Sequence, residues 1–182
     1  MNAERTTGNE LEGRVIAIAG VGGGLGPLVA ERLATAGAIV GGTDRDEEAL
    51  ARVGAALPDA ERWDGRTVDL LDEEATRGWC AALVERFGRV DGLMHLVGGW
   101  RGGTPLHEAP LADWDFLHEL LIRTVQHTTR AFHDQLAASP NGRFVLVSAK
   151  QAPLANAGQR LVSPIACAHF FTPDHLARMV PL

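Results

Sequence analysis

The sequence of 182 residues is long enough for one domain with a sizeable core, and 46% of its residues are hydrophobic. A net charge of -6 without a basic cluster argues against a nucleic-acid partner. No apolar run approaches the ~20 residues that span a bilayer, so we expect no membrane partner. The N-terminus lacks a signal-peptide pattern, and two distant cysteines argue against a disulfide scaffold. We therefore expect a cytoplasmic protein.

Strand-like runs alternate with helix-like segments along the chain. Short apolar runs predict five strands, at residues 14–19, 38–43, 66–68, 92–97 and 143–147. Apolar residues at helical spacing predict helices at residues 25–36, 46–57, 72–87 and 111–138. Strands that alternate with helices form right-handed βαβ units, so we expect an α/β fold with a parallel sheet.

Three of these helices carry apolar stripes that we expect to face the core, and in the helix at residues 72–87 the stripe consists of Ala75, Trp79, Leu83 and Phe87. In the first helix the stripe consists of Leu25, Leu28, Val29 and Leu33. In the last helix it consists of Trp114, Leu117, Leu121, Val125, Phe132 and Leu136. We also expect this long helix, residues 111–138, to be the candidate surface for a homo-oligomer.

A glycine-rich loop, Gly20-Val21-Gly22-Gly23-Gly24-Leu25-Gly26, joins the first strand to the first helix. Gly20, Gly24 and Gly26 have the spacing GxxxGxG, which gives a tight turn and lets a pyrophosphate approach a helix N-terminus closely. The spacing GxGxxG fails, because its last position falls on Leu25 or Pro27. The loop therefore predicts a Rossmann fold, a doubly wound parallel sheet of about five strands; the alternative is a glycine-rich turn without a ligand.

Asp44 ends the second expected strand. A carboxylate at this point accepts hydrogen bonds from the ribose hydroxyls of NAD and repels the 2′-phosphate of NADP. Arg45 follows and softens that repulsion, whereas Gly23 leaves the loop without a basic residue. We therefore expect NAD ahead of NADP as the cofactor, and capping of the next helix is another role open to Asp44.

Together these residues resemble the short-chain dehydrogenase/reductase family over residues 12 to 158. The motifs that carry the resemblance are the glycine loop, Asp44, Val68-Asp69-Leu70, Leu96-Val97-Gly98-Gly99 and Phe144-Val145-Leu146-Val147-Ser148. The resemblance implies an NAD(P)-dependent oxidoreductase that transfers hydride between the cofactor and a small alcohol or ketone. The implied cofactor-binding residues are Gly20, Gly22, Gly23, Gly24, Leu25, Gly26, Asp44, Arg45, Asp69, Leu70, Val97, Gly98 and Gly99, with Asp69 at the adenine amino group.

The chain departs from the family at the catalytic positions. The family uses a tyrosine as general acid or base, a lysine that lowers its pKa, a serine and an asparagine. Here the tyrosine and lysine positions fall near Val162 and Ala166, the asparagine position falls near Leu121, and the sequence contains no tyrosine. Ser148 is the one surviving catalytic candidate, and Lys150 is interpreted as a solvated loop residue. The alternative function is therefore a catalytically inactive dinucleotide-binding pseudoenzyme or a truncated fragment.

The resemblance fades near Gly158. We expect a polar tail at residues 1–12, a nucleotide-binding domain at 13–158 and an atypical tail at 159–182, with the family's C-terminal strands lost by truncation or a frame shift. Cys167, His169 and His175 match no ligand spacing, so we expect no metal site.

Two residues near the fourth strand have open interpretations. His95 lies on a buried strand, and we expect it to be a hydrogen-bonded core histidine. Arg101, next to Trp100, lies where the family places a substrate loop. Its charge is either solvated or a contact for an anionic substrate.

Overall fold

The computed structural model describes residues 10–101 and 107–147, which form one sheet of five strands. The strands are β1 (Val15–Ala19), β2 (Ile39–Asp44), β3 (Trp63–Thr67), β4 (Gly92–His95) and β5 (Arg143–Leu146). Their order is β3-β2-β1-β4-β5, and every neighbouring pair is parallel. This is the strand order of a doubly wound Rossmann sheet, and it confirms the expected fold class.

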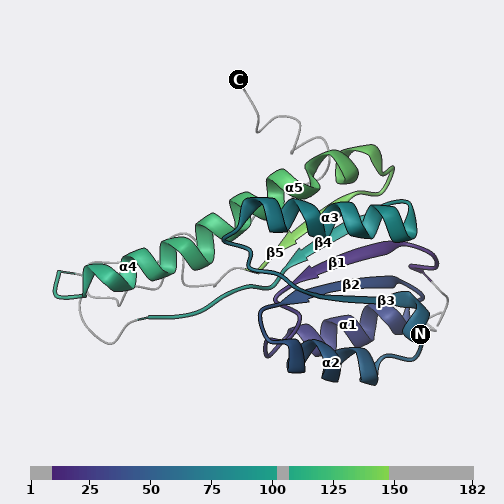
Figure 1. Cartoon of the computed structure of the whole chain (residues 1–182), viewed down its shortest axis with the longest axis horizontal. Helices are drawn as coiled ribbons and strands as arrows, with labels where there is room; N and C mark the ends of the chain where they lie inside the picture. The colour runs from purple at the N-terminus through teal and green to yellow at the C-terminus, as the bar shows by residue number, and fades with distance from the viewer. Residues whose placement is uncertain (1–9, 102–106, 148–182) are drawn as a thin grey trace, which may run out of the picture.

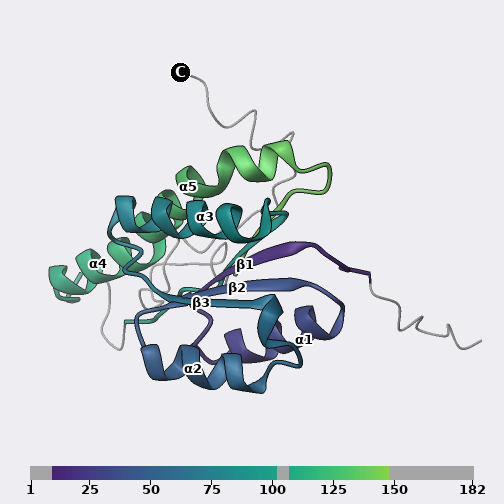
Figure 2. The ribbon, with the colours of Figure 1, turned by 45° about the vertical axis from the view of Figure 1, so that its right-hand side comes forward.

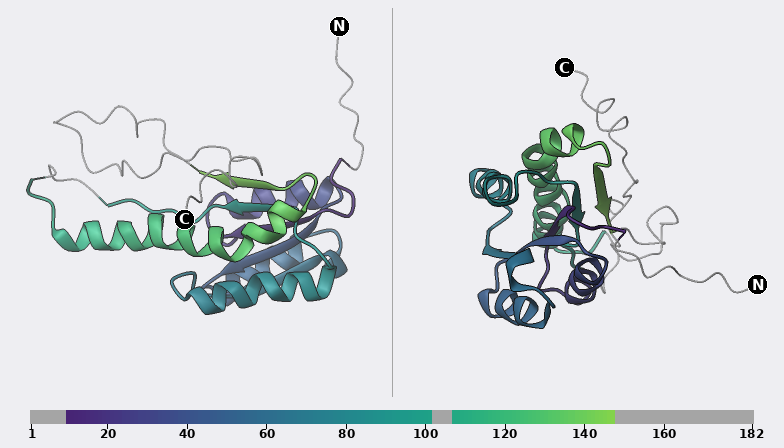
Figure 3. Two further views of the ribbon diagram at one scale, coloured as in Figure 1. Left: turned by 90° about the horizontal axis from the view of Figure 1, so that it is seen from above. Right: turned by 90° about the vertical axis from the view of Figure 1, so that its right-hand side faces the viewer.

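Helices cover both faces of the sheet (Figures 1 and 2). One face carries α1 (Gly26–Thr35) and α2 (Glu47–Ala56), and the other carries α3 (Glu73–Phe87) and α5 (Thr124–Ala138). A π turn (Glu119–Arg123) joins α4 (Leu111–His118) to α5, and the two form one long helix that extends past the sheet (Figure 3). A 3-10 turn (Ala60–Arg62) precedes β3. Among the helices in the described ranges, none has the length and apolarity needed to cross a bilayer.

The core lies in two layers, one on each side of the sheet. Toward α3 and α5, the rings of Trp79 and Phe132 meet edge to face with their centroids 4.8 Å apart. Toward α1 and α2, Ile18 and Val40 of the sheet pack with Ala30 and Leu50. Both faces of the sheet are covered, so β1 at its centre is buried along its whole length, as its continuous apolar run predicts.

The third strand begins at Trp63, before its expected start at Arg66, and ends at Thr67. It contains a single large apolar side chain, and the Trp63 ring lies against Gly42, Gly54 and Gly65. An ideal Cβ on these glycines would come within 2.3, 2.4 and 2.7 Å of the ring. One indole therefore occupies the space that several side chains would fill, which explains why the strand lacks an apolar pattern.

The expected apolar stripes are wrong at three positions. Leu25 and Leu28 are 49% and 64% exposed, because α1 packs on the sheet through the small residues Gly26 and Ala30. Trp114 is 44% exposed. In the long helix the π turn adds a residue to one helical turn and rotates the residues that follow it. The buried residues after the π turn are Thr124, His127, Thr128, Phe132 and Leu136.

Several large apolar side chains on α4 are exposed, including Leu111 and Trp114. Exposed apolar patches often mark interaction sites. The expectation that the long helix mediates a homo-oligomer stays a prediction.

Gly26 packs directly against backbone where α1 leaves the loop. An ideal Cβ on Gly26 would lie 2.1 Å from the carbonyl oxygen of Val21. We expect Gly26→Ala to lower the free energy of unfolding by about 2 kcal/mol or more, because the backbone has to shift to admit the methyl group. Urea unfolding measures this change.

Gly78→Ala is the matched control, because Gly78 lies inside α3 and nothing lies within 4 Å of its ideal Cβ. Alanine at this helical position should raise the free energy of unfolding by about 0.5–1 kcal/mol. Equal stability of the two variants would contradict the close packing at Gly26.

Candidate functional site

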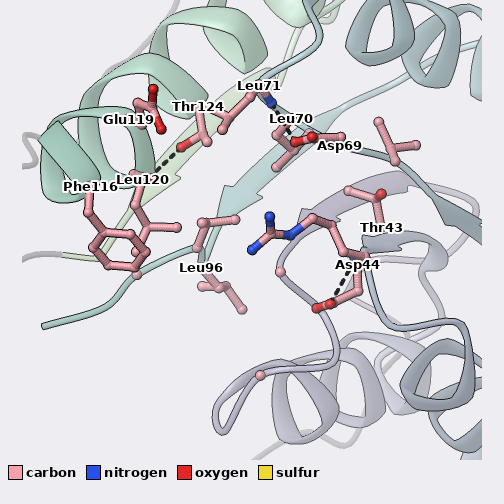
Figure 4. A pocket seen from close by; sticks show the side chains of 16 residues that line it. Thr43, Asp44, Asp69, Leu70, Leu71, Leu96, Phe116, Glu119, Leu120 and Thr124 are labelled. Atoms are coloured by element: carbon pink, nitrogen blue, oxygen red, sulfur yellow. Dashed lines mark hydrogen bonds between the residues drawn. The ribbon is translucent and has the colours of Figure 1, made fainter. Parts of the chain in front are cut away.

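A cavity of about 330 Å³ opens at the carboxyl ends of the strands, at the point where the strand order reverses between β1 and β4 (Figure 4). The loops after these two strands run to opposite faces of the sheet and leave a crevice, which is where doubly wound sheets bind ligands. The lining comes from the glycine loop, the ends of β2 and β3, the segment after β4 (residues 96–101), and the long helix near its π turn.

Most of the residues predicted to bind a cofactor meet in this cavity. Its lining includes Gly20, Gly23, Asp44, Arg45, Asp69, Leu70, Val97 and Gly98. The remaining predicted residues do not line the cavity: Gly22, Gly24 and Gly99 are adjacent in sequence to lining residues, and Leu25 and Gly26 follow Gly24. The catalytic candidate Ser148, Lys150, and the expected tail at 159–182 with Cys167, His169 and His175 lie outside the described residues. The roles of all these residues stay predictions.

The glycines of the loop serve two purposes. Gly20 has a φ of +80°, and an ideal Cβ there would lie 3.0 Å from the backbone N of Val97. A Cβ on Gly22 would lie 2.7 Å from the Cβ of Ala49, so both glycines are needed for the turn and its packing. Gly24 differs, because nothing lies within 4 Å of its ideal Cβ. Its backbone therefore faces open space that a ligand can approach.

The N-terminus of α1 is open to an anion. Leu25 is the N-cap residue and makes no side-chain hydrogen bond to the helix, and the first turn contains no acidic residue. Backbone N–H groups at a helix N-terminus carry a partial positive charge that favours phosphate. Together with the open backbone at Gly24, this end of the helix provides a cradle that fits a pyrophosphate.

Asp44 ties the glycine loop to the end of β2. Its Oδ2 accepts a hydrogen bond from the N–H of Gly22 at 2.9 Å, and its Oδ1 accepts from the N–H groups of Arg45 and Asp46 at 2.8 and 3.2 Å. The alternative that Asp44 caps the next helix is wrong: Asp46 is the N-cap of α2 and accepts from the N–H of Ala49 at 3.0 Å. A carboxylate has about four acceptor sites, so Asp44 can accept a further hydrogen bond from a ligand.

Asp69 and Leu70 form a second side of the cavity, after β3. Asp69 Oδ1 accepts a hydrogen bond from the N–H of Leu71 at 3.0 Å. The N–H of Val68 donates to the carbonyl of Asp44 at 3.2 Å, which holds this segment against the end of β2. The Asp44 and Asp69 carboxylates are therefore fixed by backbone on neighbouring sides of one cavity.

The third side is largely apolar and comes from the long helix. Phe116 and Leu120 lie beside Leu96 and line the cavity, and Glu119 and Thr124 complete this side (Figure 4). These four helix residues were not predicted from the sequence, because they lie far from the loop in the chain and the π turn changes which face of the helix meets the sheet. The one signal in the sequence was Thr124, a polar residue next to Val125 of the expected apolar stripe. In the structure its Oγ1 donates a hydrogen bond to the carbonyl of Leu120 at 2.7 Å.

His95 of β4 lies behind this apolar side and is 2% exposed. Its Nε2 is 3.2 Å from Thr124 Oγ1, and its Nδ1 is 3.1 Å from Thr128 Oγ1. Both hydroxyls also donate to carbonyls of their own helix, Thr124 Oγ1 to Leu120 at 2.7 Å and Thr128 Oγ1 to Thr124 at 3.0 Å, so each threonine oxygen can accept a hydrogen bond from the ring nitrogen beside it when that nitrogen carries the hydrogen. Burial lowers the pKa of His95 to about 4, so the ring is neutral at neutral pH. The prediction of a hydrogen-bonded core histidine is confirmed.

Comparisons with known proteins agree with this architecture. The family model for short chain dehydrogenases matches residues 14–161. The chain is 31% identical to the (2S)-[(R)-hydroxy(phenyl)methyl]succinyl-CoA dehydrogenase subunit of Thauera aromatica, over 82% of this chain and 60% of that protein. It is 33% identical to levodione reductase of Leifsonia aquatica, over 69% of this chain and 48% of that protein. The chain thus spans about half the length of the curated relatives it matches.

Solved structures share the fold. The NAD⁺-bound structure of a xylitol dehydrogenase is 25% identical, with a TM-score of 0.71 over 82% of this chain and 58% of that one. A short chain dehydrogenase from Shigella flexneri complexed with NADP is 24% identical, with a TM-score of 0.75 over 81% of this chain and 64% of that one.

The buried His95 makes stability depend on pH. Its ordinary pKa is about 6.5 and its folded-state pKa is about 4, so the unfolded chain binds a proton that the folded chain rejects between these values. The contribution of the neutral His95 ring to the free energy of unfolding is therefore fully present well above pH 6.5. It falls as the pH is lowered from 6.5 toward 4. We expect a loss of roughly 1.5 kcal/mol between pH 6.5 and pH 5, measured by urea unfolding.

His95→Asn is the matched variant, because asparagine retains a donor and an acceptor but does not titrate. It should be less stable at pH 7 and show a flatter dependence between pH 6.5 and pH 5. The same slope in both proteins would show that His95 is not the titrating group.

Proposed function

Because the chain belongs to the short chain dehydrogenase family, we propose that it is an oxidoreductase that binds a nicotinamide adenine dinucleotide at the carboxyl ends of β1 and β4. The observation that carries this proposal is the cradle at Gly24 and the N-terminus of α1, which is open and free of capping and acidic side chains. A pyrophosphate in this cradle would replace water at backbone N–H groups without displacing any side chain.

Each part of such a cofactor has a partner among the cavity residues. The backbone of the glycine loop would bind the pyrophosphate, and Asp44 would accept hydrogen bonds from the adenosine ribose. The adenine would lie between Asp69 and the apolar side formed by Leu96 and Leu120. Val97 and Gly98 would face the part that leads toward the nicotinamide. A bound cofactor of this kind supplies or accepts the hydride, and the substrate is a small alcohol or ketone.

For the choice of cofactor we favour NAD over NADP. The similar solved structures include complexes with either one. The support comes from Asp44, whose carboxylate faces the cavity and would repel a 2′-phosphate, although Arg45 lies beside it.

The second candidate function is dinucleotide binding without catalysis. The observation that favours it is the absence of tyrosine from all 182 residues, since a tyrosine is the proton donor that the family uses. Leu121, at the position expected for the family's asparagine, is an apolar residue on the π turn. In the first candidate function, the oxidoreductase, Ser148 would hold the substrate oxygen.

Selectivity for NADH over NADPH tests the role of Asp44. We expect the chain to bind NADH more tightly, as measured by titration of cofactor fluorescence. In Asp44→Asn the ratio of the two affinities should shrink about tenfold or more, because the repulsion of the 2′-phosphate is lost. Asp46→Asn is the matched control: it removes the same charge two residues away and keeps the helix cap. Tighter binding of NADPH by the unaltered chain would overturn the assignment.

Turnover separates the two candidate functions. We expect this chain to oxidise NADH with a panel of ketones about 10²–10⁴-fold more slowly than relatives that carry the tyrosine, because general acid–base help is absent. Consumption of NADH is followed by absorbance. The expectation would be contradicted if this chain turned over ketones as fast as those relatives and lost that turnover in Ser148→Ala or Lys150→Ala. That result would indicate a different active site.

A further inference from the structure

We propose that Arg101 is a positioning residue for the bound nucleotide: it clamps Phe116 and the segment after β4 into the wall of the cavity. The proposal rests on the function proposed above. In this role Arg101 is neither a solvated charge nor a contact for an anionic substrate, which are the two interpretations that the sequence leaves open.

The part of the long helix that carries Phe116 needs such a clamp. α4 extends past the carboxyl ends of the strands in two views (Figures 1 and 3). Leu111 at its start is 83% exposed, whereas the residues packed against the sheet come after the π turn. Phe116 nevertheless lines the cavity, so its position there depends on local contacts.

Arg101 makes two contacts across the gap between the segment after β4 and α4. Its guanidinium carbon lies 4.1 Å from the centroid of the Phe116 ring, within the range of a cation–π contact. Its Nε lies 3.9 Å from Oδ1 of Asp113, one turn earlier on α4. A guanidinium is flat and weakly hydrated, so it can stack on an aromatic ring and pair with a carboxylate at the same time.

Gly99 shows how closely the two segments pack. An ideal Cβ on Gly99 would lie 2.5 Å from Cδ2 of Leu120 and 3.9 Å from Cε1 of Phe116. The backbone after β4 therefore lies directly against the helix residues that line the cavity. Arg101 fixes the far end of this contact, and Gly98 at its near end lines the cavity.

The consequence for binding is preorganisation. An adenine that enters beside Leu120 would meet a wall that is already ordered, and binding would not have to order it. Without Arg101, both Phe116 and the segment after β4 gain freedom in the free protein. The affinity for any ligand that contains adenosine should then fall, although Arg101 itself does not touch the ligand.

The experiment is a double-mutant cycle with Arg101→Ala and Phe116→Leu, read by calorimetric titration with NADH and with AMP. Arg101→Ala should weaken both ligands about two- to fivefold, because one exposed cation–π contact is lost. Phe116→Leu should weaken them similarly, and the double variant should lose little more than either single variant. Arg52→Ala is the control, because Arg52 forms exposed ion pairs on α2 with Asp46 and Glu48.

Two outcomes would overturn the clamp. The first is unchanged affinity in Arg101→Ala. The second is that Arg101→Ala lowers the affinity by the same factor in the Phe116→Leu background as in the unaltered chain. The second result would mean that Arg101 contacts the ligand directly. If the unaltered chain binds neither ligand, the proposed function fails instead. Amide hydrogen exchange then tests the clamp alone: Arg101→Ala should speed exchange in α4 of the free chain, and unchanged exchange would contradict it.

Discussion

The hydrogen bond from the N–H of Gly22 to the carboxylate of Asp44 joins the two chain segments on which the whole site depends. It fixes the path of the glycine loop after β1 relative to the end of β2. The close approach of Gly26 to the Val21 carbonyl then sets the direction in which α1 leaves the loop. The same carboxylate that anchors the loop also faces the cavity, so one residue provides both the loop geometry and the negative charge that would select against a 2′-phosphate.

The two ends of the sheet use their carboxylates differently. At the amino ends, Asp91 accepts hydrogen bonds from the N–H of Val15 at 3.0 Å and the hydroxyl of Ser139 at 2.6 Å, and it pairs with Arg89. This buried group is satisfied by protein alone and contributes to packing. At the carboxyl ends, Asp44 and Asp69 accept hydrogen bonds from backbone N–H groups and also line an open cavity. Carboxylates with acceptor capacity beside a cavity can bind a ligand, whereas those enclosed by partners serve the fold.

The parts of the site that could be predicted from the sequence are those encoded within a few residues. The buried run of β1, the glycine spacing and the acidic residue at the end of β2 are local patterns with a direct physical meaning. The start of β3 could not be predicted in this way, because Trp63 packs against glycines from β2, α2 and β3 itself. The side formed by Phe116 and Leu120 was missed for a similar reason: a π turn has no sequence signature, and it decides which residues of the long helix face the cavity.

Dinucleotide binding across the glycine loop is tested most directly at Gly24, where a side chain would enter open space and touch no other part of the fold. The measurement is the affinity of Gly24→Val for NADH together with its free energy of unfolding. A branched side chain should block the approach of the pyrophosphate, so we predict that NADH binding is abolished while stability stays close to that of the unaltered chain. Unchanged affinity for NADH would show that the loop is only a turn and that the cavity does not bind a dinucleotide in this way.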